Sequence, residues 1–199
     1  MAEGQPREWL LLVYRVPAEP SRMRTYVWRQ VKALGALYLQ QAVWLLPKTE
    51  RLECELQALA LKIEGFGGEA SVLTTTSPSF TWEERVIRGF NQARAEEYAE
   101  VSEDEERFED EIRRETRKEK FTFAELEDTE ANWEKLRRWF ERVGERDFFG
   151  APARHDAEAR LAEGDRLRRE FTRRVYEHER VAEAAEDQGG DGDGQLDQG

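Results

Sequence analysis

The chain has 199 residues, a formal net charge of −12, one cysteine (Cys54) and two histidines (His155 and His178). This length allows one domain or two small ones, and so few cysteines and histidines exclude a disulfide framework and disfavour a zinc site. No apolar run reaches the roughly 20 residues of a membrane span, and the first eight residues lack a signal-peptide pattern, so we expect a cytoplasmic protein without a membrane segment.

The first part of the chain predicts strands and helices in alternation. Short apolar runs bounded by proline, glycine or polar residues are typical of buried strands, and apolar residues at helical spacing behind Ser21 and Thr49 predict two capped helices. The expected elements are strands at 9–16, 36–40, 42–46 and 69–75, and helices at 21–34 and 49–63. Their order, β-α-β-β-α-β, is that of the ferredoxin-like split βαβ arrangement.

The strand at 9–16 is apolar on both faces of the predicted sheet. Its own two helices would cover only one of these faces. The second face therefore needs another cover, either the later helices or a second copy of the chain. The second alternative predicts a homodimer.

Charge and pattern change near residue 76. Residues 1–76 hold nine basic and eight acidic residues, whereas the remainder holds 22 basic and 35 acidic residues and predicts about three helices, at 82–119, 124–143 and 156–185. The last 14 residues contain five acidic residues, five glycines and no basic residue, so we expect them to be disordered. The predicted α+β fold thus comprises a ferredoxin-like domain (1–76), a helical region (77–185) and a disordered acidic glycine-rich tail (186–199).

The best local basic cluster lies on or beside the first predicted helix. Its members are Arg22, Arg24, Arg29 and Lys32. The N-terminal end of the helix would add positive potential, so the cluster is a candidate site for phosphate or a small oxyanion. The alternative is a solvated helix face, because runs of charge commonly lie on the surface.

Other notable side chains favour structural roles. Tyr14 and Trp44 lie on predicted strands, where aromatic residues of RNA-recognition motifs stack bases, but the consensus of that motif is missing and we expect core packing. The acidic run 103–111 lacks the spacing of a calcium loop and is expected to be a solvated helix face. Cys54 is expected to be a packed core or boundary thiol. No catalytic signature occurs, so no catalytic residue, metal ligand or cofactor is predicted.

Two segments resemble a known family. WLLLVYRVPAEPSRMRTYVWRQVKALGALYLQQAVWLLP resembles the opening of the chromate resistance protein ChrB, and FTFAELEDTEANWEKLRRWFERVGERDFFGAP resembles the end of that family's N-terminal region. The resemblance runs from about Glu8 to Val181. The first segment is more distantly similar to the ferredoxin-like domain of PaaX-type transcriptional repressors and to small CRISPR-associated endonucleases, a likeness that implies the same sheet topology and dimerisation.

The endonucleases place an aspartate at the end of their first strand, and this chain does not. The corresponding region reads VYRVPAEP, and the first aspartate in the chain is Asp104. Without a metal-binding carboxylate at that strand end, we exclude phosphodiester cleavage of that type.

The resemblance to ChrB implies a regulator of chromate resistance that controls the expression of a chromate efflux transporter in a stress response. DNA and the chromate oxyanion are the implied partners. Proteins of this kind often continue into a second domain, whereas this chain ends in its acidic tail, so sensing would be lost if that domain carries it. No functional residue of the family is transferred to a position here. Two other hypotheses stay open: a non-catalytic scaffold whose helices bind another protein, and an enzyme that acts on chromate or nucleic acid.

Overall fold

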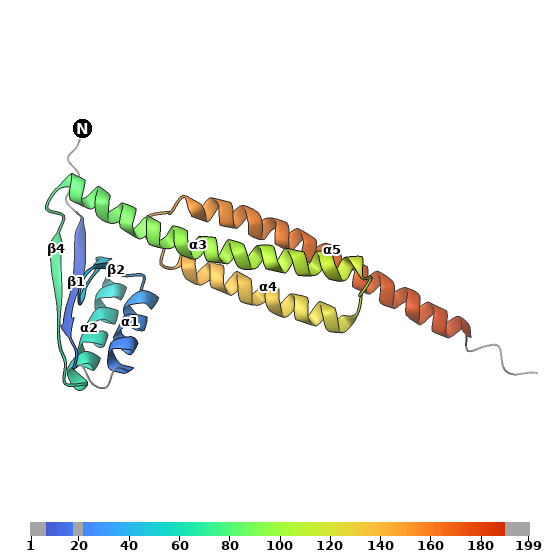
Figure 1. Ribbon diagram of the computed structural model, residues 1–199, viewed down its shortest axis with the longest axis horizontal. Coiled ribbons are helices and arrows are strands. Elements are labelled where there is room, and N and C mark those ends of the chain that lie inside the picture. The colour runs from blue at the N-terminus through green and yellow to red at the C-terminus, as the bar shows by residue number, and fades with distance from the viewer. Residues whose placement is uncertain (1–6, 18–21, 190–199) are drawn as a thin grey trace, which may run out of the picture. The chain divides into compact units, whose positions relative to one another are not determined.

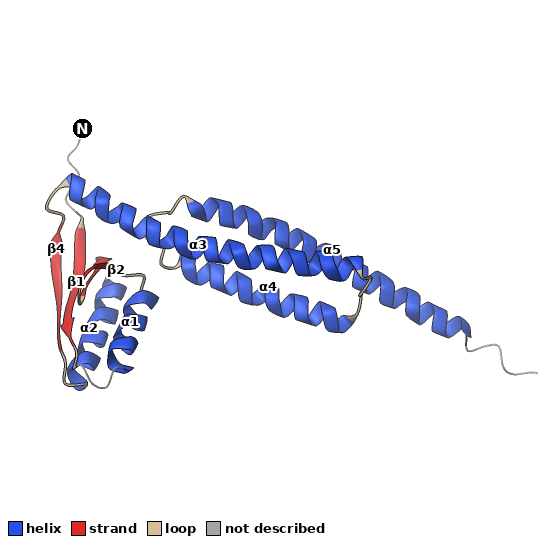
Figure 2. Cartoon of the chain, in the orientation of Figure 1, coloured by secondary structure: helices blue, strands red, loops and turns tan. Residues whose placement is uncertain are grey.

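A computed structural model describes residues 7–17 and 22–189, with side chains to residue 184 (Figures 1 and 2). The class is α+β and mostly helical, as the sequence predicts, with a four-stranded sheet and five helices in the described part of the chain. The elements are β1 (Glu8–Arg15), α1 (Arg22–Ala33), β2 (Leu37–Gln40), β3 (Val43–Pro47), α2 (Glu50–Gly65), β4 (Glu69–Thr76), α3 (Phe80–Arg117), α4 (Phe123–Gly144) and α5 (Ala153–Gly189).

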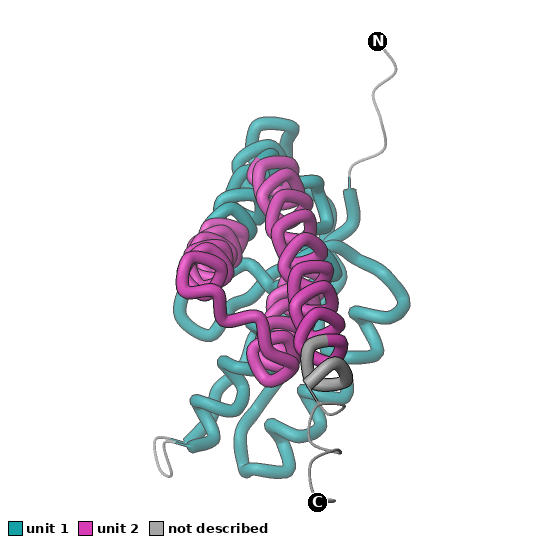
Figure 3. Tube along the Cα trace, turned by 90° about the vertical axis from the view of Figure 1, so that its right-hand side faces the viewer, with its two compact units in different colours: residues 1–96, 143–152 teal, residues 97–142, 153–199 magenta. Residues whose placement is uncertain are grey.

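The chain forms two compact units, which Figure 3 distinguishes by colour. The first comprises residues 1–96 and 143–152, and the second comprises residues 97–142 and 153–199. The change of composition at residue 76 coincides with the end of β4, whereas the two units divide within α3. The domain boundary drawn from the sequence stays a prediction.

The first unit contains one antiparallel sheet with the strand order β2-β3-β1-β4. Strand β1 pairs with β4 over its full length, from Glu8 opposite Thr76 to Arg15 opposite Glu69. On its other side β1 pairs with β3, so the most apolar strand occupies the interior of the sheet. Helices α1 and α2 pack against one face of this sheet (Figure 1).

The face beneath α1 and α2 holds the larger apolar core. Successive residues of a strand point to opposite faces, so Leu10 and Leu12 of β1 share this side. Trp44 is buried here as expected, with 4% of its surface exposed, and Tyr14 packs partly against the same cluster. The predicted cap of the second helix is present, because the Thr49 side chain accepts a hydrogen bond from the backbone N–H of Leu52 at 3.2 Å.

The opposite face of β1 is covered within the chain at one end. Trp9 is fully buried, its ring stacks on Phe90 of α3 at 6.0 Å between centroids, and it also contacts Phe149 at 5.9 Å. The intrachain alternative for covering this face is therefore correct for that end of the strand. Further along the same face, Val13 remains 39% exposed, and Leu73 of β4, which pairs with Leu11, remains 50% exposed.

The second unit is helical and packs through a narrow apolar seam. Val101, Phe108 and Ile112 on α3 are buried. Phe171 and Val175 of α5 are buried as well, whereas His178 is exposed. Aromatic pairs join the helices, and the loop between α3 and α4, at ring separations of 5.6 to 5.9 Å; they are Tyr98–Phe140, Phe108–Trp133 and Phe121–Phe171.

Three expectations from the sequence need correction. Cys54 is exposed, because it lies two residues after buried Leu52 and so about 200° around the helix. The acidic run is not wholly solvated, since Glu105 within it is only 1% exposed. Helix α5 extends to Gly189, past the predicted start of the tail at residue 186. Ser21 and residues 190–199 lie outside the described part of the chain, so neither that cap nor the rest of the tail is tested.

No helix in the described part of the chain combines the length and the apolar character that a membrane crossing requires.

Candidate functional site

The exposed surface of helix α1 carries four basic side chains and no acidic one. Val27 and Val31, four residues apart, form the buried stripe, and the helix contains no aspartate or glutamate. The four predicted site residues Arg22, Arg24, Arg29 and Lys32 are all exposed on this helix. The surrounding stretch 20–49 contains five basic residues and no acidic residue, in a chain whose net charge is −12.

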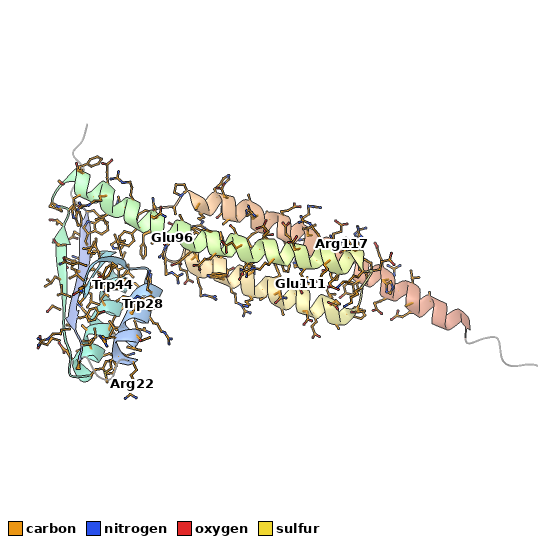
Figure 4. The ribbon with its side chains drawn as sticks, in the orientation of Figure 1. Arg22, Trp28, Trp44, Glu96, Glu111 and Arg117 are labelled. Carbon is orange, nitrogen blue, oxygen red and sulfur yellow. The ribbon has the colours of Figure 1, made fainter. Side chains whose placement is uncertain are left out.

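The structure separates these four basic residues into two groups. Arg22 and Arg29 are seven residues apart and so share one side of α1, while Arg24 and Trp28, four residues apart, share another. Figure 4 labels Arg22 and Trp28 on this helix. Arg24 lines a surface hollow, and the other three do not. Sequence reasoning therefore found the helix but not the concave part of its surface.

We call this concavity the α1 hollow. It has a volume of about 650 Å³ and is open to solvent. Its walls come from the end of β1, from α1 and from the β2–β3 hairpin, and its lining residues are Tyr14, Arg15, Val16, Arg24, Thr25, Trp28, Tyr38, Gln41 and Ala42.

Two half-exposed aromatic rings distinguish the α1 hollow from an ordinary charged surface. Trp28 is 51% exposed and Tyr38 is 53% exposed. The Tyr38 ring meets the buried Trp44 ring edge to face at 5.2 Å, which fixes its orientation. The sequence reading missed both exposed rings. A usable signal was present for Trp28, since it falls outside the buried stripe of its helix.

The basic residues around the α1 hollow differ in how far their charge is compensated. Arg15 forms an ion pair with Glu69 at 2.6 Å. Arg22, Arg29 and Lys32 form no ion pair with any carboxylate of the described chain. Their positive charge is therefore available to an anion from solution.

The second unit shows the opposite behaviour, because most of its cations have a carboxylate within 4 Å. Many of these pairs follow the i, i+3 or i, i+4 spacing of a helix surface. The paired cations are Arg107, Arg113, Arg114, Lys118, Lys120, Arg137, Arg138, Arg154, Arg166, Arg168, Arg169, Arg173 and Arg174.

The backbone at the edge of the α1 hollow adopts an unusual conformation. Ala42 has a φ of 58°, in the left-handed region that residues with a Cβ rarely occupy. The Ala42 carbonyl accepts a hydrogen bond from the backbone N–H of Tyr14 at 3.1 Å, which ties the hairpin to β1. Strained backbone of this kind concentrates at functional surfaces.

A separate feature of the second unit is a buried acid, Glu105. Its Oε1 atom has no hydrogen-bond partner within the described chain. Burial first, and then the neighbouring Glu109, raise the pKa of Glu105 to about 8, and the positive charges of Arg160 and Arg113 lower it by less. Glu105 is therefore protonated at neutral pH and donates a hydrogen bond to Glu109.

The described residues contain no group of three histidine, cysteine, aspartate or glutamate side chains placed to hold a metal ion.

Comparison with known proteins identifies similar sequences. The family model described as "Protein ChrB, N-terminal" matches residues 24–182. A protein of Cupriavidus metallidurans named Protein ChrB is 36% identical over 92 residues, which are 46% of this chain. The matched segment spans only 28% of that relative's length. No solved structure matches the chain.

Proposed function

This chain belongs to the ChrB N-terminal family, and from that premise we propose that it is a regulatory protein of chromate resistance. In this proposal it controls the expression of a chromate efflux transporter, directly or through a partner, acts in the cytoplasm and has no catalytic activity. The family match over residues 24–182 is the observation that carries the proposal.

The basic face of α1 supports a direct contact with DNA. Protein–DNA affinity depends on cations that neutralise phosphates, and each neutralised phosphate releases counterions. Arg22, Arg29 and Lys32 are exposed cations without carboxylate partners in the described chain, so they meet this requirement. We assign the duplex backbone contact to these residues together with Arg24.

We further assign the first unit to the ferredoxin-like arrangement and propose that the protein forms a homodimer. The element order β-α-β-β-α-β and the antiparallel strand order β2-β3-β1-β4 support the first assignment. The exposed apolar side chains Val13 and Leu73 on the uncovered part of the sheet support the second. A monomer mass from multi-angle light scattering would contradict the proposed homodimer.

The regulatory proposal is tested by titrating the full chain into labelled DNA from upstream of chromate-resistance genes. Fluorescence anisotropy is recorded with and without chromate across a salt series. Saturable binding that prefers this sequence and is released by chromate supports a self-sufficient regulator. If the protein prefers this sequence but chromate does not change its affinity, chromate sensing is assigned to a partner. If the protein shows no sequence preference, direct regulation is contradicted.

A charge-matched pair of variants locates the contact. Replacing Arg22, Arg29 and Lys32 by alanine should lower the slope of log affinity against log salt by about one for each phosphate that the protein no longer neutralises. The control replaces three other exposed cations of the first unit by alanine, and these are Arg51, Arg85 and Arg88. Equal effects of the two triple variants would contradict a contact through α1.

A scaffold is the second candidate, and the aromatic end of the helical unit favours it. Phe123 is 48% exposed and Tyr176 is 53% exposed, and their rings meet at 5.6 Å. Exposed apolar groups that cluster in this way commonly mark protein interaction sites. A scaffold predicts a stoichiometric partner in a pull-down that the double variant Phe123→Ser, Tyr176→Ser loses.

A further inference from the structure

We propose that the α1 hollow binds single-stranded nucleic acid, with a base against Trp28 and Tyr38 and a backbone phosphate on Arg24. This inference concerns a different ligand from the duplex of the regulatory proposal and does not depend on it. It rests on the size of the hollow, the exposure of its rings and the charge around it.

The size and composition of the hollow fit a nucleotide better than a small oxyanion. Its volume of about 650 Å³ lies within the range of roughly 300 to 1,000 Å³ that is usual for pockets that bind small organic molecules. A tetrahedral oxyanion is held by charged hydrogen-bond donors and gains nothing from indole and phenol walls. A nucleotide has both a flat apolar face and a phosphate, and so it uses every wall of the site.

The aromatic rings favour an unpaired base. Trp28 and Tyr38 line the hollow with about half of their surface exposed, and the Tyr38 ring packs edge to face against Trp44. Bases in a duplex are stacked inside the double helix, whereas an unpaired base presents a free face to an aromatic side chain. The hollow therefore discriminates in favour of single strands.

The charge around the hollow fits a continuous backbone. Arg24 of α1 and Arg15 of β1 both line the hollow, and Arg15 forms an ion pair with Glu69. Arg22 and Arg29 continue the positive surface along α1 outside the hollow. A strand whose base occupies the hollow thus finds further phosphate contacts beyond it, which a free mononucleotide would not use.

The test measures binding of the full chain to a fluorescein-labelled single strand of about 12 nucleotides, which is within the length that such sites cover. We expect Trp28→Ala and Tyr38→Ala each to weaken this binding by about tenfold, the loss typical of one removed base–aromatic stack. The matched control is Tyr176→Ala, which removes a tyrosine of the same 53% exposure from α5. All three side chains are half-exposed, and thermal melting of each variant verifies that it folds.

Four outcomes decide the proposal. Loss of single-strand binding in both hollow variants but not in Tyr176→Ala supports it, whatever the duplex titration shows. Single-strand binding that is absent, or that is equally strong in all variants, overturns it. If thymidine monophosphate competes with the same affinity as the labelled strand, the proposal of single-strand binding is contradicted and the hollow is assigned to a free nucleotide. A change from dimer to monomer in Trp28→Ala on light scattering overturns it in favour of a contact between copies.

Discussion

The protonation of Glu105 should make the stability of the helical unit depend on pH in the direction opposite to most acidic residues. The pKa of Glu105 is about 8 in the folded chain and 4.5 as its ordinary value. Between these two values the folded chain holds a proton that the unfolded chain has released. The free energy of unfolding therefore falls as pH rises, by about 1.4 kcal/mol per pH unit.

The stabilisation from this group is complete below about pH 4.5, decreases through the neutral range and is lost above about pH 8. Over the interval from pH 4.5 to pH 7 the loss is about 3 kcal/mol. This is a large part of the total stability of an ordinary domain, which is about 5 to 15 kcal/mol.

Glu105→Gln should abolish this dependence. Glutamine keeps the shape of the protonated acid and donates a hydrogen bond to Glu109, but it has no proton to release. At about pH 5 the variant and the wild type should be similarly stable, and at pH 7 the variant should be more stable by about 3 kcal/mol. Urea unfolding followed by far-ultraviolet circular dichroism measures the difference.

The control is Glu106→Gln, which removes an exposed acid from the next position of α3 and should keep the wild-type dependence on pH. Acids with a lowered pKa, such as Glu163 and Asp165, stabilise the fold above pH 4.5 and lose that effect in acid, but they contribute equally to both proteins and cancel. Parallel loss of stability in the wild type and in Glu105→Gln from about pH 5 to pH 8 would refute a protonated Glu105.

Three further changes test local features of the first unit through the urea midpoint. Thr49→Ala removes the cap of α2 and the hydrogen bond to Leu52, and should lower the free energy of unfolding by about 1 kcal/mol; Thr49→Ser should retain most of it. Ala42→Gly relieves a left-handed backbone and should raise stability by about 1 kcal/mol, and a decrease would show that the φ of 58° is not strained. Gly68→Ala places a Cβ 2.6 Å from the carbonyl oxygen of Arg15 and should cost about 2 kcal/mol; an unchanged midpoint would contradict that close approach.

The order of the elements was predictable because it depends on local patterns. The apolar run of β1 and the repeat of Leu52, Leu56, Leu59 and Ile63 each fit one kind of element, and proline and glycine mark where these end. The predicted ends differ from the observed ones by up to four residues; for example, β3 ends at Pro47, one residue later than predicted. Hydrogen bonds, which single-residue patterns do not encode, set these ends.

The cover of the second sheet face could not be assigned to particular residues from the sequence. Phe148 and Phe149 lie in a segment that reads as a loop, more than 130 residues after Trp9, yet they pack with it in one cluster. Nothing local to either segment predicts that contact. The burial of Glu105 could not be predicted for a related reason. A run with seven acidic residues is typical of a solvated helix face, and only the packing of the neighbouring helices buries one of them.

The candidate site was predictable in its charge but not in its shape. The four basic residues are visible in sequence, yet only Arg24 reaches the hollow, which also needs residues from β1 and the β2–β3 hairpin. A hollow formed by segments distant in sequence has no local pattern. Exposure is likewise a property of the fold, so the half-exposed Trp28 and the buried Trp44 cannot be told apart by residue type.

The net charge of −12 does not argue against binding of a polyanion at α1, because electrostatic contacts are decided over short distances. The Debye length is about 10 Å at an ionic strength of about 0.1 M, so charges further away are largely screened. In the helical unit most cations already have a carboxylate within 4 Å and compensate one another. On α1 the exposed cations Arg22, Arg29 and Lys32 have no such partner in the described chain. An approaching phosphate therefore meets a positive field at this surface even though the whole chain is acidic, and added salt should weaken their attraction. The ion pairs of the helical unit are balanced and do not attract the phosphate.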